Sequence, residues 1–332
     1  MTTDILITGA AGFIGKAVLT ELSSKVEINV DGAPRTIGNI LALDLSTDAL
    51  LDLADHDPRI QPISGSLSDK AVLHQIAAVQ PGVIVHLAAV VSSAAEADFK
   101  LGIDVNVNAT IGLIDLIRQF SVAPVFVFSS SVAVFSCADN DTIDEDTLPR
   151  PMSSYGTQKL IGELLVRDAS RKGIIRGRTL RFPTISVRPG KPNAAASSFA
   201  SGIIREPLAG QNTVLPVGKD LRLHLASPDR ACSNTLAAIA LPQDALHGET
   251  TITLPGVSVT VAEMLDALGK IGGDAVVARV IEKYDARVAQ IVRSWPGKIL
   301  TPRAEQMGFE ADDSIEQIIE QHASLTPERS KS

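Results

Sequence analysis

The strongest constraint on this chain is an apolar run followed by three evenly spaced glycines. The run Ile5 to Ile7 is typical of a buried parallel strand, and a helical pattern continues from the glycines to Leu22. A helix N-terminus directs free N–H groups and a positive dipole toward an anion. Gly9 permits a tight turn, Gly12 lets a pyrophosphate approach the backbone, and Gly15 lets the helix pack on the strand. The segment predicts a phosphate-binding turn.

Composition narrows the classes of partner. The 332 residues carry a formal net charge of −8 and contain no basic run. This charge argues against nucleic acid or an anionic membrane surface as the main partner. No apolar stretch approaches the ~20 residues that a membrane-spanning helix needs. The two cysteines, Cys137 and Cys232, fit a reducing compartment and suggest no metal cluster. We therefore expect a cytoplasmic protein with no metal and no membrane partner.

Beyond the glycine turn, apolar strand patterns alternate with helical patterns. Further strands are expected at Ile40 to Leu43, Arg59 to Ile63, Val83 to Ala89, Pro124 to Ser131 and Gly177 to Ile185. One long helix is expected from about Glu96 to Phe120. This alternation predicts an α/β fold with a doubly wound parallel sheet. Ligands of such sheets bind at the carboxyl ends of the strands, which is where the sequence places Gly9, Asp44, Ser66, Ala88 and Ser131.

Two acidic residues compete for the adenosine ribose of a dinucleotide, which an acid at the end of the second strand binds. Asp31 ends an alternating segment that is typical of an exposed strand or a hairpin arm. Asp44 follows a continuously apolar run, as expected for an interior parallel strand. Asp44 is therefore preferred over Asp31. A carboxylate there would repel a 2′-phosphate, so the sequence favours NAD over NADP.

Tyr155 and Lys159 stand four residues apart, so they share one face of a helix. An ammonium near a phenol favours the phenolate and lowers the phenol pKa from its usual ~10. Such a phenol can exchange protons with an alcohol or a carbonyl. Ser131, at the end of the fifth strand, can hold the reacting oxygen in line with Tyr155. These three residues form the predicted catalytic set.

Three strings together resemble the extended short-chain dehydrogenase/reductases. They are Gly9 to Gly15, Phe128 to Ser131, and Tyr155 to Lys159. The resemblance covers nearly the whole chain. It implies a Rossmann-type doubly wound sheet, bound NAD and a catalytic role for Ser131, Tyr155 and Lys159. Asn106 matches the family's Asn-Val-x-Gly-Thr pattern with Ala in place of Gly, and Ser66 stands where many members have Asp.

The resemblance also implies a cofactor site and a domain plan. The expected NAD contacts are Gly9, Gly12, Phe13, Ile14, Gly15, Asp44, Ser66, Leu67, Leu87, Ala88, Ala89, Asn106, Tyr155, Lys159, Pro183, Thr184 and Ile185. Residues 1–185 would form mainly the Rossmann domain. Residues 186–325 would form mainly a smaller C-terminal substrate lobe, with some segments returning to the sheet. Residues 326–332 would be a flexible tail.

Two further regions resemble one subfamily of these enzymes. They are Leu180 to Pro207 and Ser294 to Gly297. This subfamily oxidises a four-carbon sugar acid at C2 to a 2-oxo acid with NAD. The resemblance therefore implies a small sugar acid as the substrate.

A small polyol acid needs a cation for its carboxylate and polar partners for its hydroxyls. Arg188 can present a bidentate fork to a carboxylate, but it could equally fix its loop through a salt bridge. Ser197 and Ser198 can contact hydroxyls, but they could equally cap a helix. The full predicted substrate set is Ser92, Ser131, Tyr155, Arg188, Asn193, Ser197 and Ser198.

Two rival functions stay open at this point. A nucleotide-sugar epimerase or dehydratase would need cations for a diphosphate, and Arg222 and Arg287 are the candidates. A catalytically silent NAD-binding regulator would not need the intact catalytic set. By family analogy we expect a homodimer through the long helix and the Tyr155 helix. Apolar side chains such as Ile111 and Leu164 suit either that contact or packing on the sheet.

Overall fold

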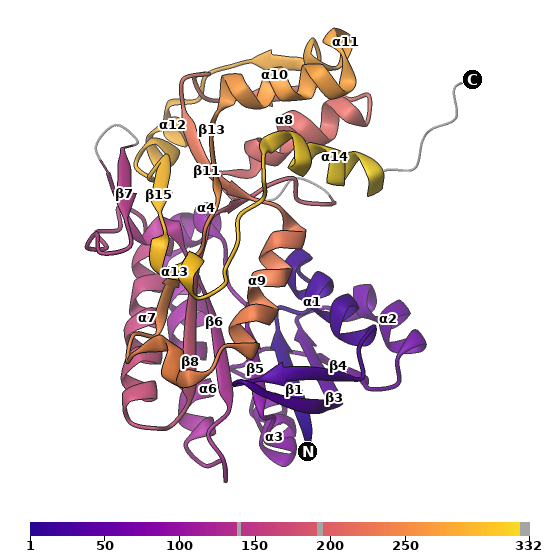
Figure 1. Ribbon diagram of the computed structural model, residues 1–332, viewed down its shortest axis with the longest axis vertical. Helices are drawn as coiled ribbons and strands as arrows, with labels where there is room; N and C mark the ends of the chain where they lie inside the picture. Colours follow the sequence, from indigo (N-terminus) through magenta and orange to yellow (C-terminus); the bar gives the residue numbers. More distant parts are fainter. Residues whose placement is uncertain (138–140, 191–194, 326–332) are drawn as a thin grey trace.

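The computed structural model describes residues 1–137, 141–190 and 195–325. Its centre is an eight-stranded sheet (Figure 1). The spatial order is β12 (Thr251–Thr253), β8 (Arg176–Phe182), β6 (Val125–Ser131), β5 (Val83–His86), β1 (Thr2–Thr8), β3 (Ala33–Asp44) and β2 (Glu27–Val30), with β4 (Ile60–Ser64) also paired to β3. Every pairing in this sheet is parallel except that of β2 with β3, which form an antiparallel hairpin.

The order of the strands reverses beside β1. The chain runs from β1 outward to β3 and β4, returns to β5 on the other side of β1, and continues outward to β6 and β8. This reversal is the topological switch point of a doubly wound sheet, where a crevice opens between the carboxyl ends of the strands. The predicted fold class is confirmed.

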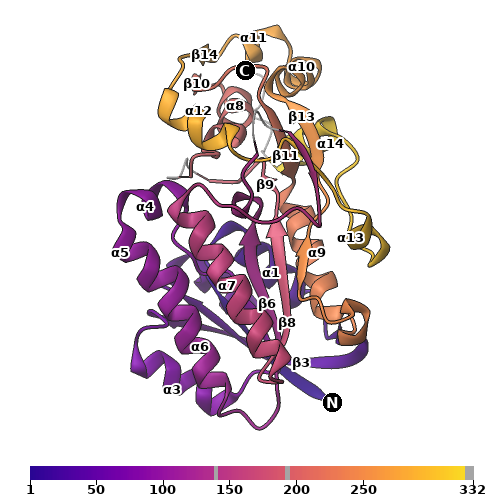
Figure 2. The same ribbon diagram turned by 90° about the vertical axis from the view of Figure 1, so that its left-hand side faces the viewer.

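Helices cover both faces of the sheet (Figures 1 and 2). Because side chains alternate along a strand, Ile5 and Ile7 of β1 enter one apolar core and Leu6 enters another. The first core is closed by α1 (Phe13–Ser23) and α9 (Pro228–Ala240). The second is closed by α3 (Lys70–Val79), α6 (Ala109–Ile117) and α7 (Ser154–Arg171). The short α2 (Leu51–His56) precedes β4.

The long helix expected from Glu96 to Phe120 is not continuous, so that prediction is wrong. The structure has α4 (Ser92–Ala97), α5 (Phe99–Gly102), a π-helical segment (Ile103–Asn108) and α6. The break lies at Asp98, whose backbone is extended and whose carboxylate accepts a hydrogen bond from the Leu101 amide. Asp98 thus caps a new helix instead of continuing the old one.

A smaller lobe lies beyond the carboxyl ends of the strands (Figure 1). Its sheets are β9 (Thr184–Ile185) with β11 (Arg222–Ala226) and β13 (Val257–Thr260), and β10 (Thr213–Leu215) with β14 (Val280–Glu282). Its helices are α8 (Ser198–Leu208), α10 (Val261–Gly272), α11 (Asp274–Val277), α12 (Ala286–Arg293) and α14 (Ile315–Leu325). This lobe has its own apolar core, which includes Ile203, Leu223, Met264 and Ile319.

Several segments connect the lobe and the sheet. α9 and β12 return from the lobe to the main sheet, where β12 pairs with β8. β7 (Thr142–Asp144) pairs with β15 (Lys298–Leu300), and α13 (Pro302–Gln306) follows β15. No helix in the described ranges is both long enough and apolar enough to cross a membrane.

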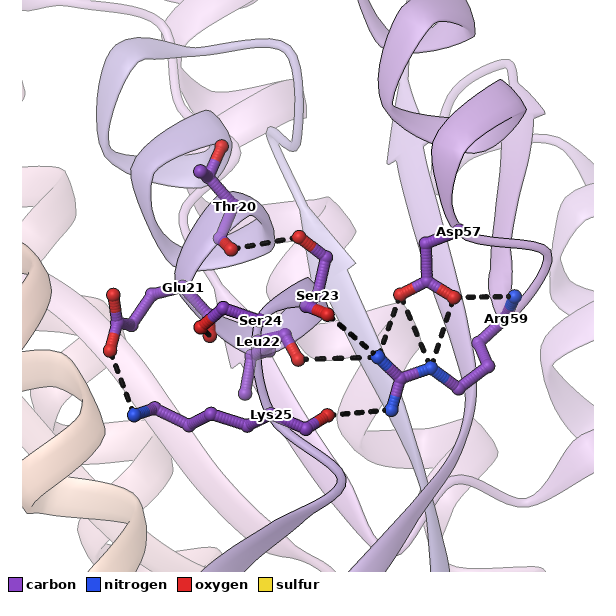
Figure 3. Close-up of polar contacts among 8 residues, drawn as sticks. All are labelled: Thr20, Glu21, Leu22, Ser23, Ser24, Lys25, Asp57 and Arg59. Carbon is purple, nitrogen blue, oxygen red and sulfur yellow. Dashed lines mark hydrogen bonds and ion pairs between the residues drawn. The ribbon is translucent and has the colours of Figure 1, made fainter.

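Arg59 fixes the C-terminal end of α1 (Figure 3). Its guanidinium donates to the Lys25 carbonyl at 2.8 Å and to the Ser23 carbonyl at 3.1 Å, and it pairs with Asp57 at 2.8 Å. A cation suits the negative end of a helix dipole, where the last carbonyls have no partner within the helix. These contacts hold α1 beside β4, with its N-terminus at the glycine turn.

Candidate active site

A cavity of about 750 Å³ opens at the switch point. Its walls come from the turns after β1, β3, β4, β5 and β6, from α7, and from the small lobe. The residues predicted from the sequence that line it are Gly9, Gly12, Phe13, Ile14, Gly15, Asp44, Ser66, Leu67, Leu87, Ala88, Ala89, Ser92, Ser131, Tyr155, Lys159, Pro183, Thr184, Ile185, Arg188 and Ser197. Predicted site residues that are far apart in the sequence thus line the same cavity.

The glycine turn leaves no room for side chains. Gly9 has φ of +71°, and a Cβ there would lie 2.8 Å from the Ala88 amide nitrogen. A Cβ on Gly15 would lie 2.4 Å from the Gly9 carbonyl oxygen. The turn therefore packs against the end of β5 and against the start of α1. The turn and the α1 N-terminus face the cavity, an arrangement that suits an anion.

The two acidic candidates have different surroundings. The Asp44 carboxylate lines the cavity and accepts hydrogen bonds from the Ala11 amide at 2.9 Å and the Leu45 amide at 2.8 Å. Asp31 lies in the β2–β3 hairpin turn and pairs with Arg176 and Arg178. Asp31 does not line the cavity, because it precedes β3, whereas the cavity lies at the carboxyl end of that strand. Of the two acidic candidates, Asp44 is therefore the one that lines the cavity.

Asn106 is a predicted cofactor contact that does not line the cavity. Its side-chain oxygen accepts from the Val90 amide at 2.8 Å. Its side-chain nitrogen donates to the Val90 carbonyl at 3.1 Å and to Gln158 at 2.7 Å. Because both ends of the amide are engaged, Asn106 holds the segment after β5 in place from behind the cavity wall.

One predicted substrate contact of the described residues, Ser198, also stands apart from the cavity lining. Ser198 is the first residue of α8 and is not part of the wall. Asn193 lies outside the described residues. Ser92 does line the cavity, where its hydroxyl accepts a hydrogen bond from the Ala196 amide at 3.1 Å.

The predicted catalytic set converges on one side of the cavity. The Ser153 hydroxyl caps α7 by accepting from the Gly156 amide at 3.1 Å, which fixes the first turn of the helix. Tyr155 is hydrogen-bonded to the Ser131 side chain. The Lys159 ammonium lies 5.7 Å from the centre of the Tyr155 ring and donates to the Ser129 carbonyl at 2.7 Å.

Burial dominates the titration of this set. Burial raises the pKa of Tyr155 to about 12, although the Arg188 charge and the Ser131 hydrogen bond act to lower it. Burial also lowers the pKa of Lys159 to about 7, against the charge of Glu163. The sequence predicted a lowered Tyr155 pKa caused by Lys159. The structure contradicts this, because desolvation of the phenolate outweighs the nearby cations and Arg188 is the cation that opposes it.

Arg188 reaches the cavity from the loop after β9. Its guanidinium donates to the Ile185 carbonyl at 2.9 Å and to the Ser197 hydroxyl at 3.0 Å, and lies 5.7 Å from the Phe13 ring centre. No carboxylate of the described ranges pairs with it, so the alternative of a loop-fixing salt bridge finds no partner there. Ser197 makes no side-chain capping bond to α8, which removes that alternative for Ser197.

Sequence reasoning gave no role to several residues of the cavity wall. Trp295 lies there, although it stands far along the chain from the other wall residues. It belonged to a string singled out only for its resemblance, so no local signal assigned it to the site. Val90, Val91, Leu101 and Val105 also line the wall and carry no sequence pattern of their own.

Comparison with known proteins decides the family. Residues 5–249 match the family described as the NAD dependent epimerase/dehydratase family. The chain belongs to that family. It is 45% identical over 316 residues to a protein of Cupriavidus necator named D-erythronate dehydrogenase, covering 95% of this chain and 96% of that one. A Haemophilus influenzae protein of the same name is 38% identical, with coverage of 96% and 98%.

Solved structures agree on the fold. A structure described as the nucleoside-diphosphate-sugar epimerase from Agrobacterium tumefaciens superposes with a TM-score of 0.88 at 34% identity, covering 98% of this chain and 94% of that one. An L-threonine dehydrogenase of Clostridium difficile reaches 0.83 at 22% identity, with 97% of each chain covered, which shows the fold alone. The expectations of an NAD cofactor and of an NAD-dependent dehydrogenase are confirmed.

Proposed function

We propose that this protein oxidises D-erythronate at C2 to the 2-oxo acid, with NAD as the hydride acceptor. The names of its two similar full-length relatives support this substrate. The observation that carries the proposal is Arg188, which lines the cavity with no acidic partner in the described ranges and acts on the Tyr155 phenol. Arg188 is half-buried, and a cation held partly out of water without an anion costs free energy that a substrate carboxylate would offset.

In the proposed mechanism, bound NAD supplies the acceptor for the hydride that leaves C2. The Tyr155 phenolate takes the proton of the C2 hydroxyl, while Ser131 hydrogen-bonds the same oxygen and keeps it in line. The Lys159 ammonium, 5.7 Å from the centre of the Tyr155 ring, would offset only part of the cost that burial places on the phenolate. Arg188 binds the substrate carboxylate with two parallel hydrogen bonds from its guanidinium. Ser92 and Ser197 line the same cavity, where their hydroxyls can contact the other hydroxyls of the substrate.

The main rival is a nucleotide-sugar epimerase, which the name of the Agrobacterium structure suggests. That reaction needs cations for a diphosphate. Arg222 does not line the cavity and lies 3.6 Å from Glu263, and Arg287 is exposed on α12. The dehydrogenase therefore fits these side chains better than the epimerase.

A panel of four-carbon and longer aldonates with NAD tests the proposal. We expect NADH to accumulate with D-erythronate and the product to carry its carbonyl at C2, as read by NMR. A carbonyl at another carbon would refute the C2 assignment. A protein that keeps bound NAD, forms no NADH and interconverts nucleotide sugars would be an epimerase. No reaction with any sugar acid or nucleotide sugar would favour a silent NAD-binding protein.

We also propose a homodimer through α6 and α7, in the cytoplasm. Ile111 and Leu164 remain 45% and 58% exposed on these helices, whereas Leu113 and Ile117 of α6 are buried against the sheet. The two exposed side chains are thus free to contact a second copy. Light scattering of the Ile111→Glu, Leu164→Glu variant tests this, because a dimer that uses this face would dissociate and any other assembly would persist.

A further inference from the structure

Three polar residues stand four positions apart along the start and length of α8. They are Ser197, which precedes the helix, Ser201 and Arg205. Residues at this spacing lie above one another on one helix face. Ser197 and Ser201 are buried, and the Arg205 side chain is 11% exposed and pairs with Glu206. We call these three residues the α8 stripe.

Each member of the α8 stripe contacts a different part of Arg188. The Ser197 hydroxyl accepts from the Arg188 guanidinium at 3.0 Å. The Ser201 hydroxyl accepts from the Arg188 amide at 3.0 Å. The Arg205 guanidinium donates to the Arg188 carbonyl at 2.7 Å. The side chain and both backbone polar groups of Arg188 are therefore held by one helix.

The α8 stripe fixes the position of Arg188 but does not offset its charge. Burial lowers the pKa of Arg188, and the nearby charge of Arg205 acts in the same direction. Arg205 has Glu206 as its counter-ion, whereas Arg188 has none in the described ranges. Ser201 and Arg205 do not line the cavity. They act on its contents only through the position of Arg188.

We propose that Ser201 and Arg205, together with Ser197, are positioning residues that aim the Arg188 fork at the substrate carboxylate. The α8 stripe thereby sets the preference for a substrate that ends in a carboxylate over its neutral analogue. The inference rests on the proposed function, in which Arg188 binds that carboxylate. A bidentate contact requires fixed geometry, so a looser Arg188 loses affinity for the carboxylate while the reacting groups stay in place.

The test compares Ser201→Ala and Arg205→Gln with the unchanged protein. D-Erythronate is measured as the substrate, and D-erythronamide, its neutral analogue, as a substrate or competitive inhibitor. We expect the KM for D-erythronate to rise roughly tenfold, about 1.4 kcal/mol, with kcat nearly unchanged. The constant for the amide and the affinity for NAD should change less than about twofold, since neither involves the lost contact.

Thr235→Val is the matched control, because it removes a buried helix hydroxyl that donates to the Ala231 carbonyl of its own helix. It should alter neither constant. Equal weakening of D-erythronate and the amide would overturn the proposal, because it would indicate general disorder of the lobe. An unchanged KM in both stripe variants would also overturn it. If Ser201→Ala does not fold, Ser201→Cys keeps a weak acceptor and should show a smaller rise in KM.

Arg188→Ala separates this proposal from the function on which it rests. If Arg188→Ala abolishes the preference for the carboxylate and the stripe variants do not, only the positioning proposal fails. If Arg188→Ala leaves that preference intact, the assignment of Arg188 in the proposed function fails, whatever the stripe variants do.

Discussion

At the scale of single residues, the proposed mechanism depends on the Tyr155 phenol, and burial and neighbouring groups shift its pKa in opposite directions. Burial raises the pKa of Tyr155 to about 12, whereas Arg188 and Ser131 favour its ionised form. A substrate carboxylate bound to Arg188 would weaken the effect of the Arg188 charge on the Tyr155 pKa. Lys159 would then be the nearby cation whose charge is not offset by the substrate. Lys159, with its pKa lowered to about 7, is charged in only part of the molecules near neutral pH.

Tyr155→Phe removes the proposed base and keeps the ring. Turnover should fall about 100-fold or more, the usual contribution of a positioned acid–base group. NAD affinity should stay within a few-fold, because the cavity wall keeps its shape. The measurements are NADH formation and NAD titration by fluorescence. Tyr284→Phe, which changes the chain's other, exposed tyrosine, is the control. Full activity in Tyr155→Phe would remove Tyr155 from the mechanism.

Asp44→Ala tests the acid beside the cofactor. The carboxylate is expected to bind the adenosine ribose and to repel a 2′-phosphate. Its loss should raise the KM for NAD roughly tenfold, as for one charged hydrogen bond, and should narrow the preference for NAD over NADP. Steady-state kinetics with both cofactors measure this. Asp48→Ala, an exposed neighbour, serves as the control. An unchanged preference would remove Asp44 from the ribose contact.

At the scale of elements, local signals decided what the sequence could predict. The glycine spacing predicted the β1–α1 turn, because backbone packing there excludes any Cβ. The four-residue spacing placed Tyr155 and Lys159 on one helix face. The break at Asp98 was missed, because its neighbours suit a helix and only the cap itself marks the boundary. The contacts of Arg188 with Ser201 and Arg205 were not predicted, because no periodic pattern in the sequence indicates that these residues meet.

Gly15→Ala tests the packing of α1 on the glycine turn. The new Cβ would lie 2.4 Å from the Gly9 carbonyl oxygen, so the backbone must move. We expect a loss of stability of about 1–3 kcal/mol, typical of overpacking, and weaker NAD binding. Gly112→Ala on α6 is the control, because a Cβ there meets nothing within 4 Å and should stabilise the helix slightly. Urea unfolding and NAD titration measure both, and equal behaviour of the two variants would contradict the expectation.

At the scale of the whole molecule, the site exists only where the two lobes meet. The sheet and its helices supply the glycine turn and the predicted catalytic set, and the lobe supplies Arg188, Ser197 and Trp295. Each lobe also buries one histidine. His86 of β5 contacts Thr8 at 2.7 Å and Thr110 at 3.0 Å, and His224 of β11 contacts the Leu254 carbonyl at 3.3 Å.

These two histidines make stability depend on pH. Burial lowers the pKa of His86 to about 3 and that of His224 to about 4, from 6.5 in the unfolded chain. The unfolded chain therefore binds protons first as the pH falls below 6.5. The free energy of unfolding therefore falls as the pH drops from 6.5, down to about pH 3 for His86 and about pH 4 for His224. The loss is up to about 1.4 kcal/mol per pH unit for each histidine. Urea unfolding across this range measures the slope. In His86→Gln this slope should fall by up to about 1.4 kcal/mol per pH unit. His74→Gln, a substitution at an exposed position, is the control, and equal slopes in the two variants would contradict the lowered pKa of His86.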